Sequence, residues 1–218
     1  HGDITGAVGG LAARYKNSIT VNGTVKSKGE NHAVYLFDSD NTVQVGSAIV
    51  DSESRTAVGV YVDEFAVSTV TVGSPDKRGQ IIGKEYGLRV RCGALVTVYG
   101  DIVGDKWGLY TVQDSNVTVH GNVTSTGETG EGHGVYCFAN STPATINING
   151  DVEGKSGTYV HGAGSTLTIN GNVTAHGEDP KSNYGIYASR AKVSVTGNLV
   201  ASRCLGAHSY GLSEIQVD

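Results

Sequence analysis

Val117-Thr-Val-His-Gly-Asn-Val123 and Leu167-Thr-Ile-Asn-Gly-Asn-Val173 are two copies of one seven-residue motif. In both copies apolar residues alternate with polar ones, and a glycine-asparagine pair follows. Alternation with a period of two is typical of a β-strand that buries one face. Glycine and asparagine both tolerate the positive φ of a sharp turn. The motif therefore predicts a short strand that ends in a tight corner.

Further copies of the motif recur along the chain. They occupy residues 19–25, 96–102, 146–152 and 193–199, with weaker copies that begin at Val43 and Val70. The corner position of each copy is held by Gly23, Ser47, Ser74, Gly100, Gly121, Gly150, Gly171 and Gly197. Successive corners are 21 to 29 residues apart. A second motif of glycine, an aliphatic residue and tyrosine alternates with the first, as in Gly134-Val-Tyr136 and Gly185-Ile-Tyr187.

A strand repeat of this length predicts a β-solenoid. Leucine-rich repeats need a leucine-asparagine ladder, which is missing, and helical repeats need apolar residues at helical spacing. One coil cannot bury its own apolar face, so neighbouring coils must stack. We predict an all-β fold, a right-handed parallel β-helix of about eight rungs of 21–29 residues each. Residues 1–218 would form a single domain, with 1–18 as a partial N-terminal rung or cap and 19–218 as repeats.

Two segments carry a resemblance to a known group of proteins. Asn172-Val-Thr-Ala175 and Tyr184-Gly-Ile-Tyr-Ala188 resemble the β-solenoid repeats of large bacterial cell-surface proteins, which are similar in shape to autotransporter passengers and adhesins. The resemblance implies a secreted or surface-exposed, extended module that adheres or acts as a stalk and is not an enzyme. It also implies that the chain is a fragment of a longer surface protein. These are expectations about localisation and role.

The amino-acid composition limits the kinds of partner and site that this protein is expected to have. The net charge of −5 argues against a nucleic-acid partner, which would need a basic face. No apolar run is long enough for a membrane helix. Three cysteines give no disulfide framework. Cys92 and Cys137 fall at apolar strand positions and should be buried and unpaired, whereas Cys204 should be a free thiol in a loop. We expect no cofactor, and no ligand spacing in the sequence is diagnostic of a metal.

The tyrosines of the second motif should form an outward ladder, because residues two apart share a strand face and the partners two beyond them include charged residues. The ladder comprises Tyr35, Tyr61, Tyr110, Tyr136, Tyr159 and Tyr187. Exposed aromatic rows bind sugars or anchor protein partners. In-register tyrosines also stack on one another, with Arg89 covering a neighbouring ring. Self-stacking is the favoured reason for the repeat, and the two roles are compatible.

The length of the chain between a corner and the next tyrosine motif varies twofold, which is typical of a binding edge. The only tryptophan lies there in a short segment between longer ones. The candidate ligand-binding residues on this edge are Trp107, Tyr110, Tyr136, His133, Glu131, Glu128, Lys77 and Arg78. Trp107 shares its strand phase with Leu109, so the alternative is that the indole packs inward and caps the core.

No catalytic residues are assigned. Polysaccharide lyases and hydrolases with this fold use carboxylates clustered on one sheet, whereas the acids and bases here fall in long loops. We therefore expect a binding module for carbohydrate or a host surface protein. A passive stalk is the first alternative, and a polysaccharide-active enzyme is the second. The sequence does not indicate the oligomeric state.

Overall fold

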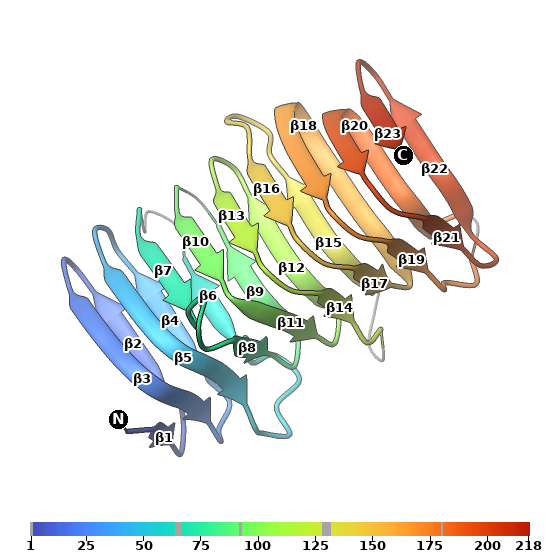
Figure 1. Ribbon diagram of the computed structural model, residues 1–218. Helices are drawn as coiled ribbons and strands as arrows, with labels where there is room; N and C mark the ends of the chain where they lie inside the picture. Colours follow the sequence, from blue (N-terminus) through green and yellow to red (C-terminus); the bar gives the residue numbers. More distant parts are fainter. Residues whose placement is uncertain (1, 64–66, 92, 128–131, 180) are drawn as a thin grey trace.

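The computed structural model describes residues 2–63, 67–91, 93–127, 132–179 and 181–218. All of its described regular structure is β-strand, and twenty-three strands wind into a parallel β-solenoid of about nine turns (Figure 1). In Figure 1 the front strands run downward and the fainter rear strands run back upward while the coil advances to the right. This is a right-handed coil, as predicted.

Three sheet faces run along the solenoid. The valine face holds β7 (Thr69–Val72), β10 (Leu95–Val98), β13 (Asn116–Val119), β16 (Thr145–Ile148) and β23 (Glu214–Val217). The short face holds β1 (Ile4–Gly6), β8 (Gly79–Ile82), β11 (Gly100–Gly104), β14 (Val123–Ser125), β17 (Val152–Gly154), β19 (Val173–Ala175) and β21 (Leu199–Ala201). The tyrosine face holds β2 (Leu11–Arg14), β4 (Val34–Phe37), β6 (Val60–Val62), β9 (Tyr86–Val90), β12 (Trp107–Val112), β15 (His133–Phe138) and β22 (Leu205–Tyr210).

Four longer strands bend round a corner and belong to two faces. β3 (Ser18–Ser27) and β5 (Thr42–Val50) join the valine face to the short face, and β18 (Ser156–Ile169) and β20 (Tyr184–Val195) join the tyrosine face to the valine face. Equivalent repeat positions pair in register, for example Val96 with Val117. About nine turns replace the eight expected. β1 and β2 lie within the segment that was expected to be only a partial rung or cap, and β23 adds a strand to the valine face after the last predicted copy of the motif.

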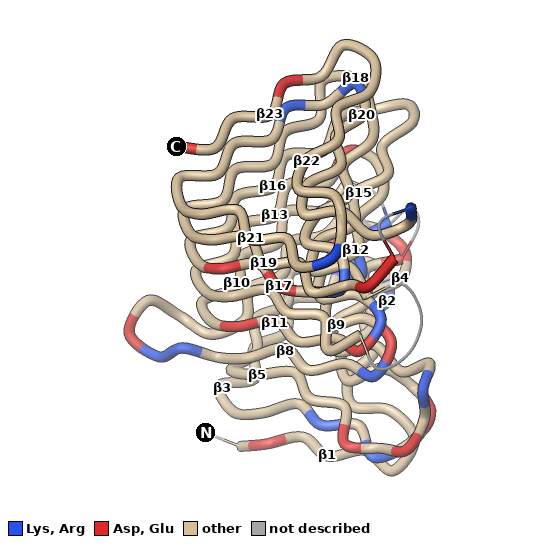
Figure 2. Tube along the Cα trace, turned by 90° about the vertical axis from the view of Figure 1, so that its right-hand side faces the viewer, with Lys and Arg blue, Asp and Glu red and all other residues tan. Residues whose placement is uncertain are grey.

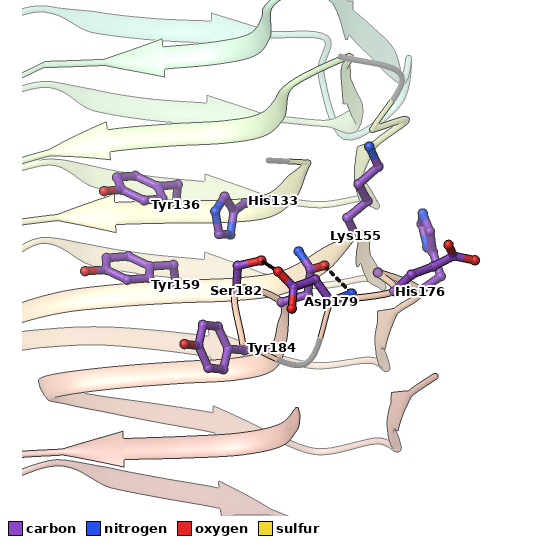
Figure 3. Close-up of a pocket in the computed structure, with 11 residues that line it drawn as sticks. His133, Tyr136, Lys155, Tyr159, His176, Asp179, Ser182 and Tyr184 are labelled. Atoms are coloured by element: carbon purple, nitrogen blue, oxygen red, sulfur yellow. Dashed lines mark hydrogen bonds between the residues drawn. The ribbon is translucent and has the colours of Figure 1, made fainter. Parts of the chain in front are cut away.

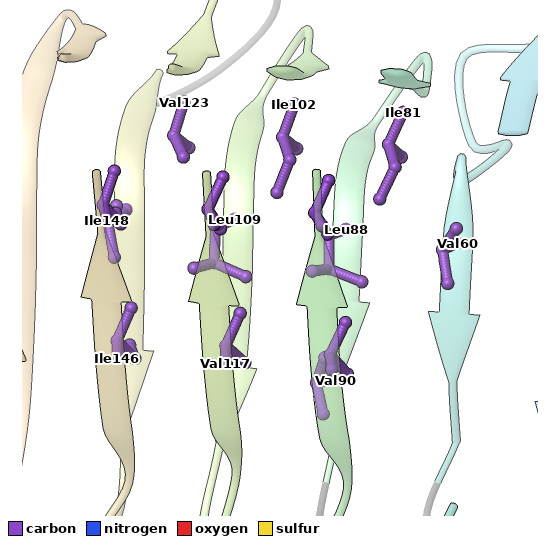
Figure 4. Packing of buried hydrophobic residues seen from close by; sticks show 14 of the residues in the cluster. Val60, Ile81, Leu88, Val90, Ile102, Leu109, Val117, Val123, Ile146 and Ile148 are labelled. Atoms are coloured by element: carbon purple, nitrogen blue, oxygen red, sulfur yellow. The ribbon is translucent and has the colours of Figure 1, made fainter. Parts of the chain in front are cut away.

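The interior is a stack of aliphatic side chains. Val60, Leu88 and Leu109 occupy one position in successive coils and are fully buried (Figure 4). Val135 holds the same position in the next coil and is also fully buried. Each such side chain contributes roughly 1.5–3 kcal/mol through removal of apolar surface from water. The next position in this column is Thr158, also fully buried. Stacking therefore closes the core that no single coil could close.

The corner glycines are needed for close approach and not for a left-handed backbone. Gly121, Gly150 and Gly171 do not have positive φ, so the positive-φ expectation is wrong at these corners. A Cβ on Gly121 would lie 2.2 Å from the carbonyl oxygen of Gly100 in the preceding coil. Any larger residue would push the coils apart.

The polar residue after each corner glycine forms the expected rung-to-rung ladder. The Oδ1 of Asp101 accepts from the Asn122 amide at 2.8 Å, and Asn122 Oδ1 accepts from the Asp151 amide at 2.9 Å. Asp151 does the same for Asn172 at 2.7 Å, and Asn172 for Asn198 at 2.9 Å. Asp101 and Asp151 are thus corner residues, as predicted.

Two corners lie at other residues than predicted. Ser47 pairs with Thr24, the residue after Gly23, so the corner of that coil is Gly46. Gly79, not Ser74, pairs with Gly100, so the inserted loop of this coil precedes the short face instead of following it. A Cβ on Gly79 would lie 1.9 Å from the Gly46 carbonyl oxygen, which explains why glycine holds this position. The loop before β8 projects from the coil, and elsewhere charged residues gather mainly in the corner loops (Figure 2).

Cys137 is buried as expected, and burial raises the pKa of its thiol to about 12. Cys204 is half-buried, and burial raises the pKa of its thiol as well. Both are free thiols. The prediction for Cys92 lies outside the described residues. No helix in the described part of the chain has the length and apolar character needed to cross a membrane.

Candidate functional site

The tyrosines of the tyrosine face form one stacked column. The ring centroids of Tyr110 and Tyr136 are 5.3 Å apart with an interplanar angle of 2°. Tyr136 and Tyr159 are 4.7 Å apart, and Tyr159 and Tyr187 are 4.6 Å apart, again with nearly parallel planes. His208 continues the stack at 5.1 Å from Tyr187. The expected self-stacking is therefore present.

Arg89 continues the column across β9, where an arginine pairs with Tyr61 on one side and Tyr110 on the other. Its guanidinium lies 4.8 Å from the ring centroid of Tyr61 and 5.6 Å from that of Tyr110. Tyr35 then stacks on Tyr61 at 5.2 Å. From Tyr61 to Tyr187 each ring face is thus covered by its neighbours, and the ring edges remain toward solvent. Tyr61 itself is buried, so the ladder is less exposed than expected.

Trp107 lies in a second aromatic column beside the first. This second column comprises His32, Tyr86, Trp107, His133 and Tyr184, each at the start of a tyrosine-face strand or just before it. The Trp107 side chain is only 7 % exposed and stacks on Tyr86 at 4.5 Å, while Lys106 Nζ lies 3.9 Å from its ring centroid. It packs with Tyr110 outside the sheet, so the interior-cap reading is wrong. β12 begins at Trp107, directly after the bend from the short face, and the alternation set by Leu109 does not extend back through that bend.

A cleft of about 820 Å³ opens further along these columns. Its lining comprises His133, Tyr136, Lys155, Tyr159, His176, Gly177, Glu178, Asp179, Ser182, Asn183 and Tyr184 (Figure 3). This volume falls in the range of small-ligand sites, roughly 300–1,000 Å³. The lining mixes aromatic rings with both signs of charge and several amide and hydroxyl groups.

The cleft exists because the second column is interrupted. Ser156 is the register partner of His133 in this coil, where neighbouring coils carry Trp107, His133 and Tyr184. The Ser156 hydroxyl accepts the Tyr184 amide at 3.3 Å, which ties down the start of β20. A small side chain between two rings leaves room for a ligand.

Described residues of the loop between β19 and β20, from 176–179 and 181–183, form the second wall of the cleft. Asp179 accepts from the Ser182 hydroxyl at 2.6 Å and from the Lys181 amide at 2.9 Å. These hydrogen bonds lower the pKa of Asp179, so its carboxylate stays ionised near neutral pH. The Asn183 amide donates to the Asp179 carbonyl, and the Tyr184 hydroxyl donates to the Lys181 carbonyl. The described part of the loop is therefore ordered by its own contacts.

Two other residues of the lining, Glu178 and His176, have partners outside the loop. Glu178 pairs with Arg203 at 3.2 Å at an exposed position, and His176 lies 3.8 Å from Glu153. Among the residues that the structure describes, no three histidine, cysteine or acidic side chains converge to hold a metal ion.

The structure brings together only some of the predicted site residues. His133 and Tyr136 line the cleft, while Trp107 and Tyr110 belong to the covered part of the columns. Lys77 and Arg78 lie at the corner between the valine and short faces, where Arg78 donates to the His120 carbonyl and approaches Asp101. Their expected grouping with Trp107 is wrong. Glu128 and Glu131 lie outside the described residues.

Several lining residues were missed, although a signal for them was present. The candidate site was predicted at Trp107 because a short connection there lies between two longer ones. The connection between β17 and β18 is shorter still, with Lys155 alone, and eight residues, 176–183, connect β19 and β20 in the next coil. The same reasoning applied to the shortest connection predicts the cleft.

No protein-family model, curated protein or solved structure matches this chain. The class of protein is therefore defined by the fold alone, as a parallel β-solenoid.

Proposed function

We propose that this chain is a binding module and that the cleft between His133 and Tyr184 binds carbohydrate. The observation that carries the proposal is the interruption of the second aromatic column at Ser156, beside a loop that presents polar groups. Sugars combine apolar C–H surfaces with many hydroxyl groups. Ring edges, amides and carboxylates at one site suit that combination.

The geometry also limits how a sugar would bind. Ring faces within the tyrosine column are covered, so a sugar would not stack on Tyr136 or Tyr159 face to face. It would enter edge-on to these rings, where polar groups fix its orientation. Asn183 and Ser182 on the loop supply donors and acceptors, and Asp179 supplies a carboxylate.

Placement outside the cell, on a bacterial surface as part of an adhesin, belongs to the same proposal. It is supported by the resemblance of the repeat to those of cell-surface solenoids. Surface labelling of intact cells of the organism that makes the protein would test this placement. A protein that is labelled only after lysis would contradict it.

A passive stalk is the second candidate, and one observation favours it. The stacked column, the corner ladder and the aliphatic core all continue with little interruption along the solenoid, as a spacer requires. A polysaccharide-active enzyme would need an acid and a base flanking the bond. Asp179 caps its own turn and Glu178 is paired with Arg203, so neither is placed well for that role.

A glycan array probed with the intact chain tests the proposal. We expect selective binding that is lost in Ser156→Tyr, which fills the cleft with the kind of ring found in neighbouring coils. Thr97→Tyr, on the outer side of the valine face, is the matched control and should bind as wild type.

An absence of binding to every glycan on the array would favour the passive stalk. Release of reducing ends from a bound polysaccharide would favour the enzyme. Equal binding by Ser156→Tyr would place the ligand elsewhere.

A further inference from the structure

The aromatic column is also interrupted near the N-terminal end of the solenoid. Ala12 on β2 pairs with Tyr35 on β4, so alanine stands where the following coils carry tyrosine. In the second column Gly9 precedes β2 where His32 precedes β4. Two ring positions of one coil are therefore held by residues without rings.

A cavity of about 390 Å³ lies where these rings are missing. Val8, Gly9 and Ala12 line one side, and Asn31, His32 and Tyr35 line the other. Val8 is 62 % exposed, which leaves apolar surface at the mouth. The cavity is separate from the cleft at Ser156, and nothing in the proposed carbohydrate site depends on it.

Tyr35 is held firmly at the end of the column. Its ring stacks on Tyr61 at 5.2 Å and meets the edge of His32 at 5.2 Å. Phe37 packs against it at 5.0 Å from further along β4 without lining the cavity. The Tyr35 hydroxyl donates to Asp63 at 2.7 Å. Its hydroxyl is thus satisfied inside the protein, and the ring presents apolar surface to the cavity.

The lining is uncharged. His32 Nδ1 accepts the Val58 amide at 3.1 Å, and burial together with Arg89 lowers the pKa of the imidazole, which is therefore neutral near pH 7. The nearest cation of β2, Arg14, is paired with Asp38 at 2.7 Å and does not line the cavity. An ionic ligand would find no counter-charge among these residues, whereas a neutral ring would find an aromatic partner.

We propose that the cavity between Ala12 and Tyr35 binds an uncharged aromatic ring, presented as a tyrosine or phenylalanine side chain of a protein partner. The guest ring takes the place of the missing member of the column and packs against Tyr35. Aromatic side chains are the usual anchors of protein interfaces because they bury much apolar surface at low entropic cost. The column supplies a rigid surface for such an anchor.

Ligand-observed NMR with p-cresol tests the ring alone, with cyclohexanol as the non-aromatic comparison. We expect saturation transfer to p-cresol and at least roughly tenfold weaker binding of cyclohexanol. Ala12→Tyr should abolish the p-cresol signal and raise Tm by about 2 °C, because its own ring completes the column. Thr20→Tyr, on the outer side of β3, is the control and should bind as wild type.

A second pair of variants separates the ring from its hydroxyl. Tyr35→Phe keeps the ring and should retain binding, whereas Tyr35→Leu should weaken it roughly tenfold. The proposal is overturned if p-cresol shows no transfer, if cyclohexanol binds equally well, or if Ala12→Tyr, folded by circular dichroism, binds p-cresol as wild type does. N-acetyl-tyrosinamide should compete with p-cresol, and failure to compete would overturn the assignment to a protein side chain.

Discussion

Thr158 is a polar residue in an aliphatic column. Its strand neighbours are Val135 and Ile186, and its hydroxyl is buried with no hydrogen-bond partner among the described residues. A buried hydroxyl without a partner costs about 1–3 kcal/mol. The residue is tolerated because threonine has nearly the shape of the valine found in the neighbouring coil.

We therefore expect Thr158→Val to raise the free energy of unfolding by about 1 kcal/mol, measured by urea denaturation. Thr168→Val, on the outer side of the valine face, is the control and should change stability by less than about 0.5 kcal/mol. A destabilised Thr158→Val protein would mean that the hydroxyl has a partner.

Trp107 is an outer residue that is buried like a core residue. It is covered by Tyr86, Tyr110 and the Lys106 side chain. Trp107→Ala should lower the free energy of unfolding by about 3 kcal/mol or more. Trp107→Tyr should lose much less, since Tyr86 shows that the column accepts tyrosine. Equal, small losses in both variants would show that the indole contributes little packing.

At the scale of the strand, the aromatic column depends on register. Rings can stack from β4 to β20 only because each tyrosine pairs with the same position in the next coil. Arg89 on β9 fits the series because a planar guanidinium packs on a ring face much as another ring does.

Two substitutions at Arg89 test this account. Arg89→Ala should lower the free energy of unfolding by about 2 kcal/mol, since it leaves the faces of three rings uncovered. Arg89→Tyr restores the repeat and should recover most of that loss. Thermal and urea unfolding provide the measurement, and the idea fails if the tyrosine variant is no more stable than the alanine variant.

At the scale of the molecule, each coil contacts only its neighbours, so stability is distributed along one dimension. Central β13 pairs with both β10 and β16, whereas β23 pairs with β20 on one side and has exposed residues. The last coil should therefore open without unfolding the rest.

Hydrogen exchange detected by NMR or mass spectrometry measures this difference. Amides of β12 and β13 should exchange roughly 100-fold or more slowly than those of β22 and β23. Uniform protection from one end to the other would instead mean that the solenoid unfolds as a single cooperative unit.

Much of the fold could be predicted from sequence because the physics is local and repeated. Period-two alternation around Val117, the glycine at each corner and the recurrence of tyrosine each specify the same coil. The corner ladder through Asn122 and the cation in the aromatic column at Arg89 followed directly, since in-register stacking places identical positions side by side.

Other features depended on the tertiary structure. The direction of Trp107 was set by the bend before β12, which strand alternation does not describe. Lys77 and Arg78 lie at a different corner from the one predicted. The register of β8 is fixed by close packing at Gly79 and not by the similarity of the sequence around Ser74 to the repeat motif. The cleft at Ser156 and the cavity at Ala12 arise where neighbouring coils leave a ring out, and a space between coils is a property of their stacking.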